Sequence, residues 1–293
     1  METLTQRHRE INRKIVFPGN RILNLNRTYL MGILNVTPDS FSDGGQFNIR
    51  EKAVSRALEM LQQGADIIDI GGESTRPGAE PVPLEVELER TVPVIQSIIR
   101  ESPSALISID TYKAKVAEAA LEAGAGLVND ISGLGFDADL PGVIARTGVP
   151  VVIMHIKGTP RNMQANPYYD DLISEIIQYF HERINLADSA GISAKQIIID
   201  PGLGFAKTLT HNYEILNRLK EIQSLGYPVM LGPSRKSFIG KLLDRPTGER
   251  LLGTAAVVAA AVLQDVPFVR VHDVREIKQV ITVCEAIKNP PSS

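Results

Sequence analysis

Residues 106–130 read LISIDTYKAKVAEAALEAGAGLVND, and this stretch contains one complete strand, helix and strand unit. Two short apolar runs, Leu106–Asp110 and Leu127–Asp130, each end in an aspartate. Between them, apolar residues recur at helical spacing over residues 116–123, and Gly124 follows as a predicted helix stop. Strands joined in this way pair in parallel through a right-handed crossover. The stretch therefore predicts a parallel sheet covered by helices.

The same unit recurs along the whole chain. Eight short apolar runs end in or just before polar residues: Leu30–Asn35, Ile67–Ile70, Leu106–Asp110, Leu127–Asp130, Val151–His155, Ile197–Asp200, Val229–Leu231 and Phe268–His272. Apolar residues follow one another in these runs, which is typical of strands buried on both faces. An open doubly wound sheet more often has about five to seven strands and begins with a glycine-rich phosphate fingerprint, which is absent here. We therefore predict an α/β protein with a single (β/α)₈ TIM barrel.

A small β-hairpin is predicted before the first barrel strand. Two short strand-like segments, Lys14-Ile-Val-Phe17 and Arg21-Ile-Leu-Asn-Leu25, flank a turn at Pro18-Gly-Asn20. We expect an N-terminal extension and hairpin over residues 1–28 that closes the barrel bottom, followed by the (β/α)₈ barrel over residues 29–288. No linker, low-complexity tract or charge run divides the chain further.

Composition excludes several functional classes. The 293 residues include 43% hydrophobic and 22% charged residues, as in soluble globular proteins. Basic residues number 31 against 34 acidic ones, so no broad electrostatic footprint for nucleic acid or an anionic membrane is present. The single Cys284 cannot form an internal disulfide or a cysteine-rich metal site. Because no signal-like or membrane-spanning segment is apparent, we expect a cytoplasmic protein without nucleic-acid or membrane partners.

Polar residues occupy nearly every predicted strand end, where the active site of such a barrel lies. They are Asn35, the stretch 71–76, Asp110, Asn129 with Asp130, His155, Asp200, Ser234 to Lys236, and Arg270 with His272. Singly, the aspartates could be helix caps or turn residues, and His155 a hydrogen-bonded scaffold residue. Arg270 differs, because a cation among apolar strand residues is costly without an anion nearby. Independent caps need not fill so many strand ends of one barrel, so we predict a shared site.

The residue types at this site indicate two kinds of ligand group. Aspartate and asparagine at the third, fourth and sixth strands suit the NH and NH₂ edge of a planar heterocycle, with a lysine donating to its carbonyl. Arginines, Lys236 and His272 suit a phosphate or pyrophosphate. No cluster with zinc-ligand spacing and no nucleophile motif is present, which argues against hydrolysis through a covalent intermediate.

Eight motifs in order resemble the dihydropteroate synthase family, from about residue 29 to residue 274. They are Asn35–Gly45 (NVTPDSFSDGG), Asp69–Gly78 (DIGGESTRPG), Ser108–Thr111 (SIDT), Val128–Gly133 (VNDISG), Met154–Pro160 (MHIKGTP), Asp200–Phe205 (DPGLGF), Pro233–Ser237 (PSRKS) and Arg270–Asp273 (RVHD). Each motif alone is weak evidence, whereas eight at compatible spacing are specific. The resemblance implies a folate-biosynthesis enzyme that joins 4-aminobenzoate to 6-hydroxymethyl-7,8-dihydropterin diphosphate and releases pyrophosphate, and that is a target of sulfonamides.

The resemblance also implies roles for individual residues. Asp110, Asn129, Asp200 and Lys236 would hold the dihydropterin, Met154 and Phe205 would line its pocket, and Arg270 would pack over the ring and reach toward phosphate. Asn35, Thr75, Arg76 and His272 would bind the diphosphate, Asn35 together with Mg²⁺. Ser234, Arg235 and Lys236 would form the aminobenzoate side. The expected catalytic set is Asn35, Arg76, Asp110, Lys236, Arg270 and His272.

The resemblance further implies a dissociative mechanism, a homodimer, and a lid formed by the loop after Asn35. A glycine- and serine-containing loop with few apolar anchors can order when a ligand offsets its entropy. Two alternatives stay open: a barrel that presents methyltetrahydrofolate for methyl transfer, and a non-catalytic pterin-binding relative. The first has no use for a diphosphate, and the second would be favoured by loss of a strand-end polar group.

Overall fold

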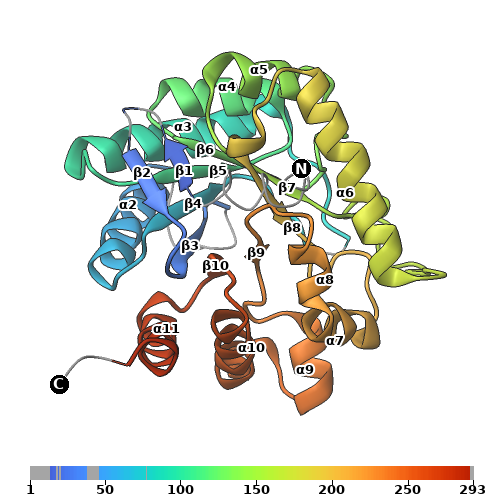
Figure 1. Ribbon diagram of the computed structural model, residues 1–293. Helices are drawn as coiled ribbons and strands as arrows, with labels where there is room; N and C mark the ends of the chain where they lie inside the picture. The colour runs from blue at the N-terminus through green and yellow to red at the C-terminus, as the bar shows by residue number, and fades with distance from the viewer. Residues whose placement is uncertain (1–13, 18, 20, 38–45, 77, 291–293) are drawn as a thin grey trace.

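The chain folds as a barrel of parallel strands surrounded by helices (Figure 1). The computed structural model describes residues 14–290 except 18, 20, 38–45 and 77. The barrel strands are β3 (Tyr29–Asn35), β4 (Ile67–Gly71), β5 (Ile107–Asp110), β6 (Leu127–Asp130), β7 (Val151–Met154), β8 (Ile197–Asp200), β9 (Met230–Leu231) and β10 (Phe268–Val271). All eight predicted apolar runs are therefore strands.

Helices follow the strands along the chain and form the outer layer. They are α2 (Gln46–Gln62), α3 (Leu84–Glu101), α4 (Ala114–Glu122), α5 (Leu140–Thr147), α6 (Leu172–Ser189), α7 (Leu209–Asn217), α8 (Leu219–Gln223), α9 (Ser237–Leu243), α10 (Leu251–Leu263) and α11 (Val274–Lys288), with short 3₁₀ turns η3 (Ala194–Gln196) and η4 (Thr247–Glu249). No helix in the described part of the chain combines the length and the apolar character of a bilayer-spanning segment.

Strand pairing closes the sheet into a barrel. The hydrogen-bonded order is β8-β7-β6-β5-β4-β3-β10-β9, with every pair parallel. An isolated parallel bridge between Ile199 on β8 and Val229 beside β9 joins the two outer members of this order. The predicted (β/α)₈ barrel is confirmed, and its strand ends meet on one face of the molecule.

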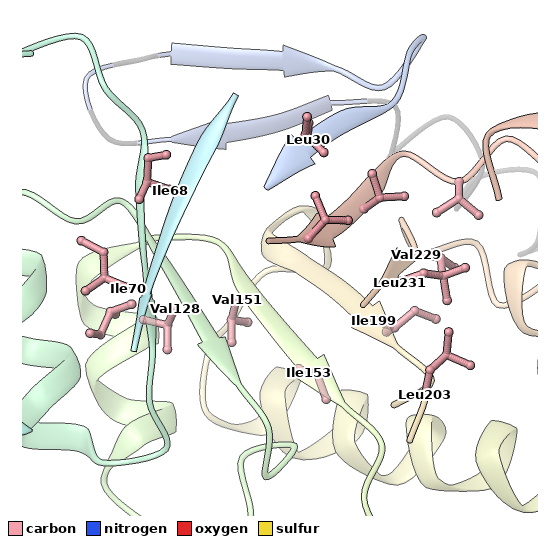
Figure 2. Packing of buried hydrophobic residues seen from close by; sticks show 14 of the residues in the cluster. Leu30, Ile68, Ile70, Val128, Val151, Ile153, Ile199, Leu203, Val229 and Leu231 are labelled. Atoms are coloured by element: carbon pink, nitrogen blue, oxygen red, sulfur yellow. The ribbon is translucent and has the colours of Figure 1, made fainter. Parts of the chain in front are cut away.

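Side chains along each strand alternate between two buried environments. Ile68, Val128 and Ile199 belong to the large apolar cluster between strands and helices, part of which Figure 2 shows. Their neighbours Ile67, Leu127 and Ile198 belong to a separate cluster at the N-terminal end of the barrel. This period of two explains why the runs are continuously apolar in sequence, since both faces of each strand are buried.

The predicted hairpin is present as β1 (Lys14–Phe17) and β2 (Arg21–Asn24), which pair antiparallel. Ile15, Phe17 and Leu23 are buried in the same cluster as the N-terminal strand residues, so the hairpin packs against that end of the barrel. The division into segments 1–28 and 29–288 stays a prediction, because residues 1–13 lie outside the described residues.

The hairpin packing predicts a position-dependent loss of stability. Ile15 is fully buried, whereas Val16 beside it is 44% exposed. Ile15→Ala should lower the free energy of unfolding by about 2–4 kcal/mol, since it removes apolar contacts and leaves a cavity. Val16→Ala should change it by less than about 0.5 kcal/mol. Urea unfolding followed by circular dichroism measures both, and equal losses for the two variants would contradict this packing.

Candidate active site

One pocket opens at the C-terminal ends of the strands and contains most of the predicted site residues. It holds about 400 Å³ of space including its open mouth, a volume in the range of small-molecule sites. Eight predicted residues line it: Thr75, Asp110, Asn129, Met154, Asp200, Phe205, Lys236 and Arg270. Ile131, Leu203, Met230 and Gly232 complete the wall. The pocket thus has an apolar body with a few convergent polar groups.

The strand order separates the polar residues into two arcs of the barrel. Strands β5, β6, β7 and β8 are neighbours, and their C-terminal ends, which we call the acceptor arc, carry Asp110, Asn129, Met154 and Asp200. Strands β4, β3, β10 and β9 are the other four neighbours, and we call their C-terminal ends and following loops the cationic arc. It carries Thr75, Arg76, Asn35, Arg270, His272, Ser234, Arg235 and Lys236. A ligand with a hydrogen-bond-donor edge at one end and an anion at the other fits this division.

Arg270 on β10 bridges the barrel interior to two carboxylates. Its Nε donates to Asp69 Oδ2 at 2.6 Å and its Nη2 donates to Asp110 Oδ2 at 2.6 Å. Asn129 Nδ2 also donates to Asp69 Oδ2, at 3.0 Å. The predicted need of Arg270 for an anion is met by these two aspartates. Burial raises the pKa of Asp110, while Arg270 opposes that rise.

Asp69 was missed by the sequence reasoning as a site residue. It lies within the apolar run of β4, is fully buried, and is the common acceptor for Arg270 and Asn129. The sequence does indicate such a role for Asp69, because a carboxylate inside an apolar strand needs a cationic or hydrogen-bonding partner, as the Arg270 guanidinium needs an anion. Asp69 joins the predicted residues as an organiser of the pocket interior.

Asp200 ends β8 in a tight turn that aims its carboxylate at the pocket. Its Oδ1 accepts from the backbone N–H of Gly202 at 2.7 Å. Gly202 has φ +70°, and a Cβ there would lie 2.1 Å from the backbone oxygen of His155, so only glycine fits. Burial raises the pKa of Asp200 to about 6, against the lowering effects of this hydrogen bond, Lys236 and other nearby cations.

Lys236 follows β9, which adjoins β8 where the barrel closes, and its charge acts on Asp200. Its Nζ lies 4.1 Å from the centre of the Phe205 ring, a cation–π arrangement. Burial lowers the pKa of Lys236 to about 8, with Arg270 lowering it further and Asp200 opposing the shift. Lys236 therefore carries a charge at neutral pH and lies beside an aromatic ring on which a flat ligand could stack.

Ser234, Arg235 and His272 lie at the rim rather than in the pocket lining. Ser234 Oγ and His272 Nδ1 are 2.8 Å apart, and Ser234 Oγ accepts from the backbone N–H of His272 at 3.1 Å. Burial and Arg270 lower the pKa of His272 to about 4. The sequence counted His272 among the cations, whereas the structure makes it a neutral hydrogen-bonding imidazole. Arg235 pairs with Asp273 through both Nε and Nη2, so its charge is already balanced there.

The loop after β4 is fixed by a buried ion cluster. Lys113 Nζ donates to Glu73 Oε2 at 2.6 Å and also bonds to Glu87, while Glu73 accepts from the backbone N–H of Val82 at 2.9 Å. These contacts hold the loop that carries Thr75 and Arg76. Thr75 lines the pocket and Arg76 is exposed beside it.

Asn35 ends β3 next to Asp110. A Cβ on Gly71, between them, would lie 3.5 Å from Asp110 Oδ2 and 3.7 Å from Asn35 Oδ1, so both oxygens point to the same place. Hard oxygen donors of this kind suit Mg²⁺ when the remaining ligands come from phosphate and water. The described residues contain no group of three or more His, Cys, Asp or Glu arranged to hold a metal. Asn35 and Asp110 alone would therefore fill only part of the coordination shell of such a metal.

Two strand-end residues have structural contacts, and one predicted segment lies outside the described residues. Asp130 accepts from the backbone N–H groups of Ser132 and Leu134, as in the turn interpretation. His155 is buried, and its Nδ1 lies 3.0 Å from Lys207 Nζ. Residues 38–45 of the proposed lid are not described, so the lid stays a prediction.

Comparisons with known proteins agree with this geometry. A family model described as pterin binding enzyme matches residues 31–272. Dihydropteroate synthase of Synechocystis is 52% identical over 262 residues, covering 89% of this chain and 90% of the relative, and that of Bacillus subtilis is 47% identical, covering 90% of each.

Solved structures give the same result. The Yersinia pestis dihydropteroate synthase in a sulfonamide drug complex superposes with a TM-score of 0.88 at 43% identity, covering 94% of this chain and 99% of that one. The Xanthomonas albilineans enzyme in complex with 7,8-dihydropteroate gives 0.84 at 39% identity, covering 95% and 100%. On this similarity over nearly its whole length, the chain belongs to the dihydropteroate synthase family of pterin binding enzymes.

Proposed function

We propose that this chain joins 6-hydroxymethyl-7,8-dihydropterin diphosphate to 4-aminobenzoate, giving 7,8-dihydropteroate and pyrophosphate. The observation that carries the proposal is the division of one pocket into an acceptor arc and a cationic arc. Solved relatives were crystallised with 4-aminobenzoic acid and with 7,8-dihydropteroate, which supports the same substrate class here. The cytosol is the location we propose for this reaction.

The pterin would lie against the acceptor arc. The Asp200 carboxylate can accept two parallel hydrogen bonds from the amino and NH groups of the pterin edge. Lys236 would donate to the ring carbonyl, and Asn129 offers both a donor and an acceptor. Met154 and Phe205 would contact the faces of the ring.

The diphosphate would lie on the cationic arc, near Arg76, Thr75 and Asn35. A neutral His272 would donate a hydrogen bond rather than a charge until an anion raises its pKa. Asn35 would hold Mg²⁺, which would supply charge neutralisation for the diphosphate oxygens. Ser234 and Arg235 would border the aminobenzoate.

The proposed chemistry is dissociative. The bond between the pterin methylene carbon and the diphosphate oxygen breaks first, and the electron pair leaves with pyrophosphate. Electron release from the dihydropterin ring stabilises the methylene cation, and the aniline nitrogen then attacks it and loses a proton. An aromatic amine needs no strong protein base, so the residues act by orientation and by neutralising the leaving group.

The reaction predicts a strict dependence on both substrates and the metal. Purified protein should form dihydropteroate and pyrophosphate in equal amounts only when the dihydropterin diphosphate, 4-aminobenzoate and Mg²⁺ are all present. Direct detection of both products measures this. Pterin binding without turnover would instead identify a non-catalytic relative, and methyl transfer from methyltetrahydrofolate would identify the other alternative.

The pterin end and the diphosphate end of the proposed site predict different effects of two substitutions. Lys236→Ala should weaken binding of pterin with or without its diphosphate by about 10- to 100-fold, because a charged hydrogen bond is lost. Arg76→Ala should weaken only the diphosphate-bearing substrate and lower kcat/KM for it. Calorimetry with both ligands measures the difference. Arg146 on α5 has a side chain that is 62% exposed. Arg146→Ala is therefore the control and should change neither affinity. Equal losses with both ligands for Arg76→Ala would contradict its placement.

We further propose that the chain forms a homodimer through α9, α10 and α11. Several of the exposed large apolar residues lie there: Leu242, Leu243, Leu252, Leu263, Val283 and Ile287. Leu252 and Leu263 are three helical turns apart and share one face of α10, as Val283 and Ile287 share one face of α11. Two packed helices that both expose apolar residues are typical of an interface.

The dimer proposal predicts a change of mass on substitution. Leu252, 83% exposed, should be covered in the dimer, so Leu252→Glu should shift the protein toward a monomer in light scattering. Ile22→Glu, at a 48% exposed position of the hairpin, should leave the dimer intact. A wild-type monomer at high protein concentration would contradict the proposal.

A further inference from the structure

The turn after β8, residues 200–207, is held by side chains from several elements. Gly204 donates through its backbone N–H to Asn212 Oδ1 at 2.7 Å, and its carbonyl accepts from Gln164 Nε2 at 2.6 Å. Tyr169 donates its hydroxyl to the carbonyl of Ala206 at 2.9 Å. Since the turn carries both Asp200 and Phe205, these contacts fix two walls of the pocket.

Lys207 is the last residue of this turn, and its side chain folds back against the turn, outside the pocket lining. It is 4% exposed, and its Nζ donates to the carbonyl of Phe205 at 2.9 Å and lies 3.0 Å from His155 Nδ1. His155 in turn donates its backbone N–H to the carbonyl of Asp200 at 2.8 Å. Lys207 therefore connects the end of β7 with the turn that follows β8.

The amine of Lys207 has no ordinary ion-pair partner. Within the part of the chain that the structure describes, no carboxylate oxygen lies within 4.0 Å of its Nζ. Burial lowers the pKa of Lys207 to about 7, and the attraction of Asp200 opposes that shift. A buried lysine without a direct counter-ion is costly, and the contacts of Lys207 with the Phe205 carbonyl and His155 offset part of that cost.

The effect on Asp200 has a defined sign. Lys207 stabilises the ionised carboxylate of Asp200, as Lys236 does from the pocket side. In the proposed substrate complex Lys236 donates to the pterin carbonyl, whereas Lys207 stays behind the turn. Lys207 is thus the lysine that would still stabilise the Asp200 carboxylate when the ligand is bound.

We propose that Lys207 is a positioning residue for the pterin: its amine holds the Phe205 carbonyl and contacts His155, and so fixes the turn whose Asp200 carboxylate would accept an aminopyrimidinone edge. This inference rests on the proposed function, because it assigns Asp200 to that edge. Lys207 itself touches no substrate in this arrangement.

Other titratable groups face the same place and enter the expected pH dependence. His155 and His211 lie near Lys207 and outside the pocket lining, and burial lowers the pKa of each, so both are neutral near pH 7. Burial raises the pKa of Tyr169, which is therefore also neutral. Asp200, Lys207, Lys236, the more distant Arg270 and Asp110 are the groups whose charges decide the profile. Burial raises the pKa of Asp110 to about 7, so Asp110 also titrates in this range.

The test is the affinity of a pterin without diphosphate, measured by calorimetry from about pH 5 to pH 8. Wild-type affinity should fall on the acidic side as Asp200 takes up a proton. Lys207→Met removes a nearby positive charge, which raises the pKa of Asp200, so this acidic limb should move to higher pH by about one unit, a tenfold loss of affinity within that limb. Lys207→Arg keeps the charge and should leave the limb in place.

Two controls separate this role from a purely structural one. Lys195→Met makes the same change at an exposed position on η3, before β8, and should leave the profile unchanged. In an Asp200→Asn background any acidic limb that remains should come from Asp110 and should not move in Lys207→Met, which should then cost much less affinity than it does in the wild type. Circular dichroism confirms that each variant is folded.

The outcomes are distinguishable. A uniform loss of affinity in Lys207→Met, with the acidic limb in its wild-type position, would overturn the inference and leave Lys207 a structural residue. If Lys207→Met does not fold, a limb displaced in Lys207→Arg would overturn it equally. Wild-type protein that binds no pterin would overturn the proposed function itself.

Discussion

The pocket depends on the double ion pair that Arg270 makes with Asp69 and Asp110. These residues come from β10, β4 and β5, so one guanidinium ties together strands on both arcs of the barrel. Each charge would be costly alone in this interior, whereas the planar guanidinium satisfies two carboxylates at once. Removing Arg270 would leave two buried carboxylates without their cation, which makes this arginine a constraint on the neighbouring side chains. Asn129 is oriented by the same Asp69 carboxylate.

Charge balance in the interior follows from this cluster. Asp69, Asp110 and Asp200 supply three negative groups, and Arg270, Lys236 and Lys207 supply three positive ones. The ion pairs are unevenly distributed. Arg270 forms ion pairs with both Asp69 and Asp110, whereas neither lysine forms a direct ion pair with Asp200. Asp200 is therefore the carboxylate with free acceptor capacity toward the pocket. Of these three carboxylates, Asp200 is the one that no described cation contacts within 4.0 Å, and it lines the pocket.

Much of this architecture could be predicted from the sequence, and the exceptions have physical causes. Eight apolar runs and their polar ends predicted the barrel and most of the pocket lining, because strand ends converge wherever a parallel sheet closes. Asp69 and Lys207 were missed, because each acts through a partner distant in sequence and neither ends a strand. The neutral state of His272 also could not be predicted, since it depends on burial and on Arg270 nearby. Arg235 was expected near the substrate, but its pairing with Asp273 is a contact that spacing does not reveal.

The hairpin at the N-terminal end of the barrel has a consequence for the order in which ligands bind and are released. Ile15, Phe17 and Leu23 pack against the lower layer of the barrel interior and seal it. With that end packed, a ligand enters and leaves the described pocket at the C-terminal ends of the strands. A molecule held at the depth of Asp200 and Asn129 must pass the rim before any molecule occupies that rim, and it can leave only after the rim is vacated. On the proposed placement of the two substrates, the depth of each binding position would therefore set the order of binding and release.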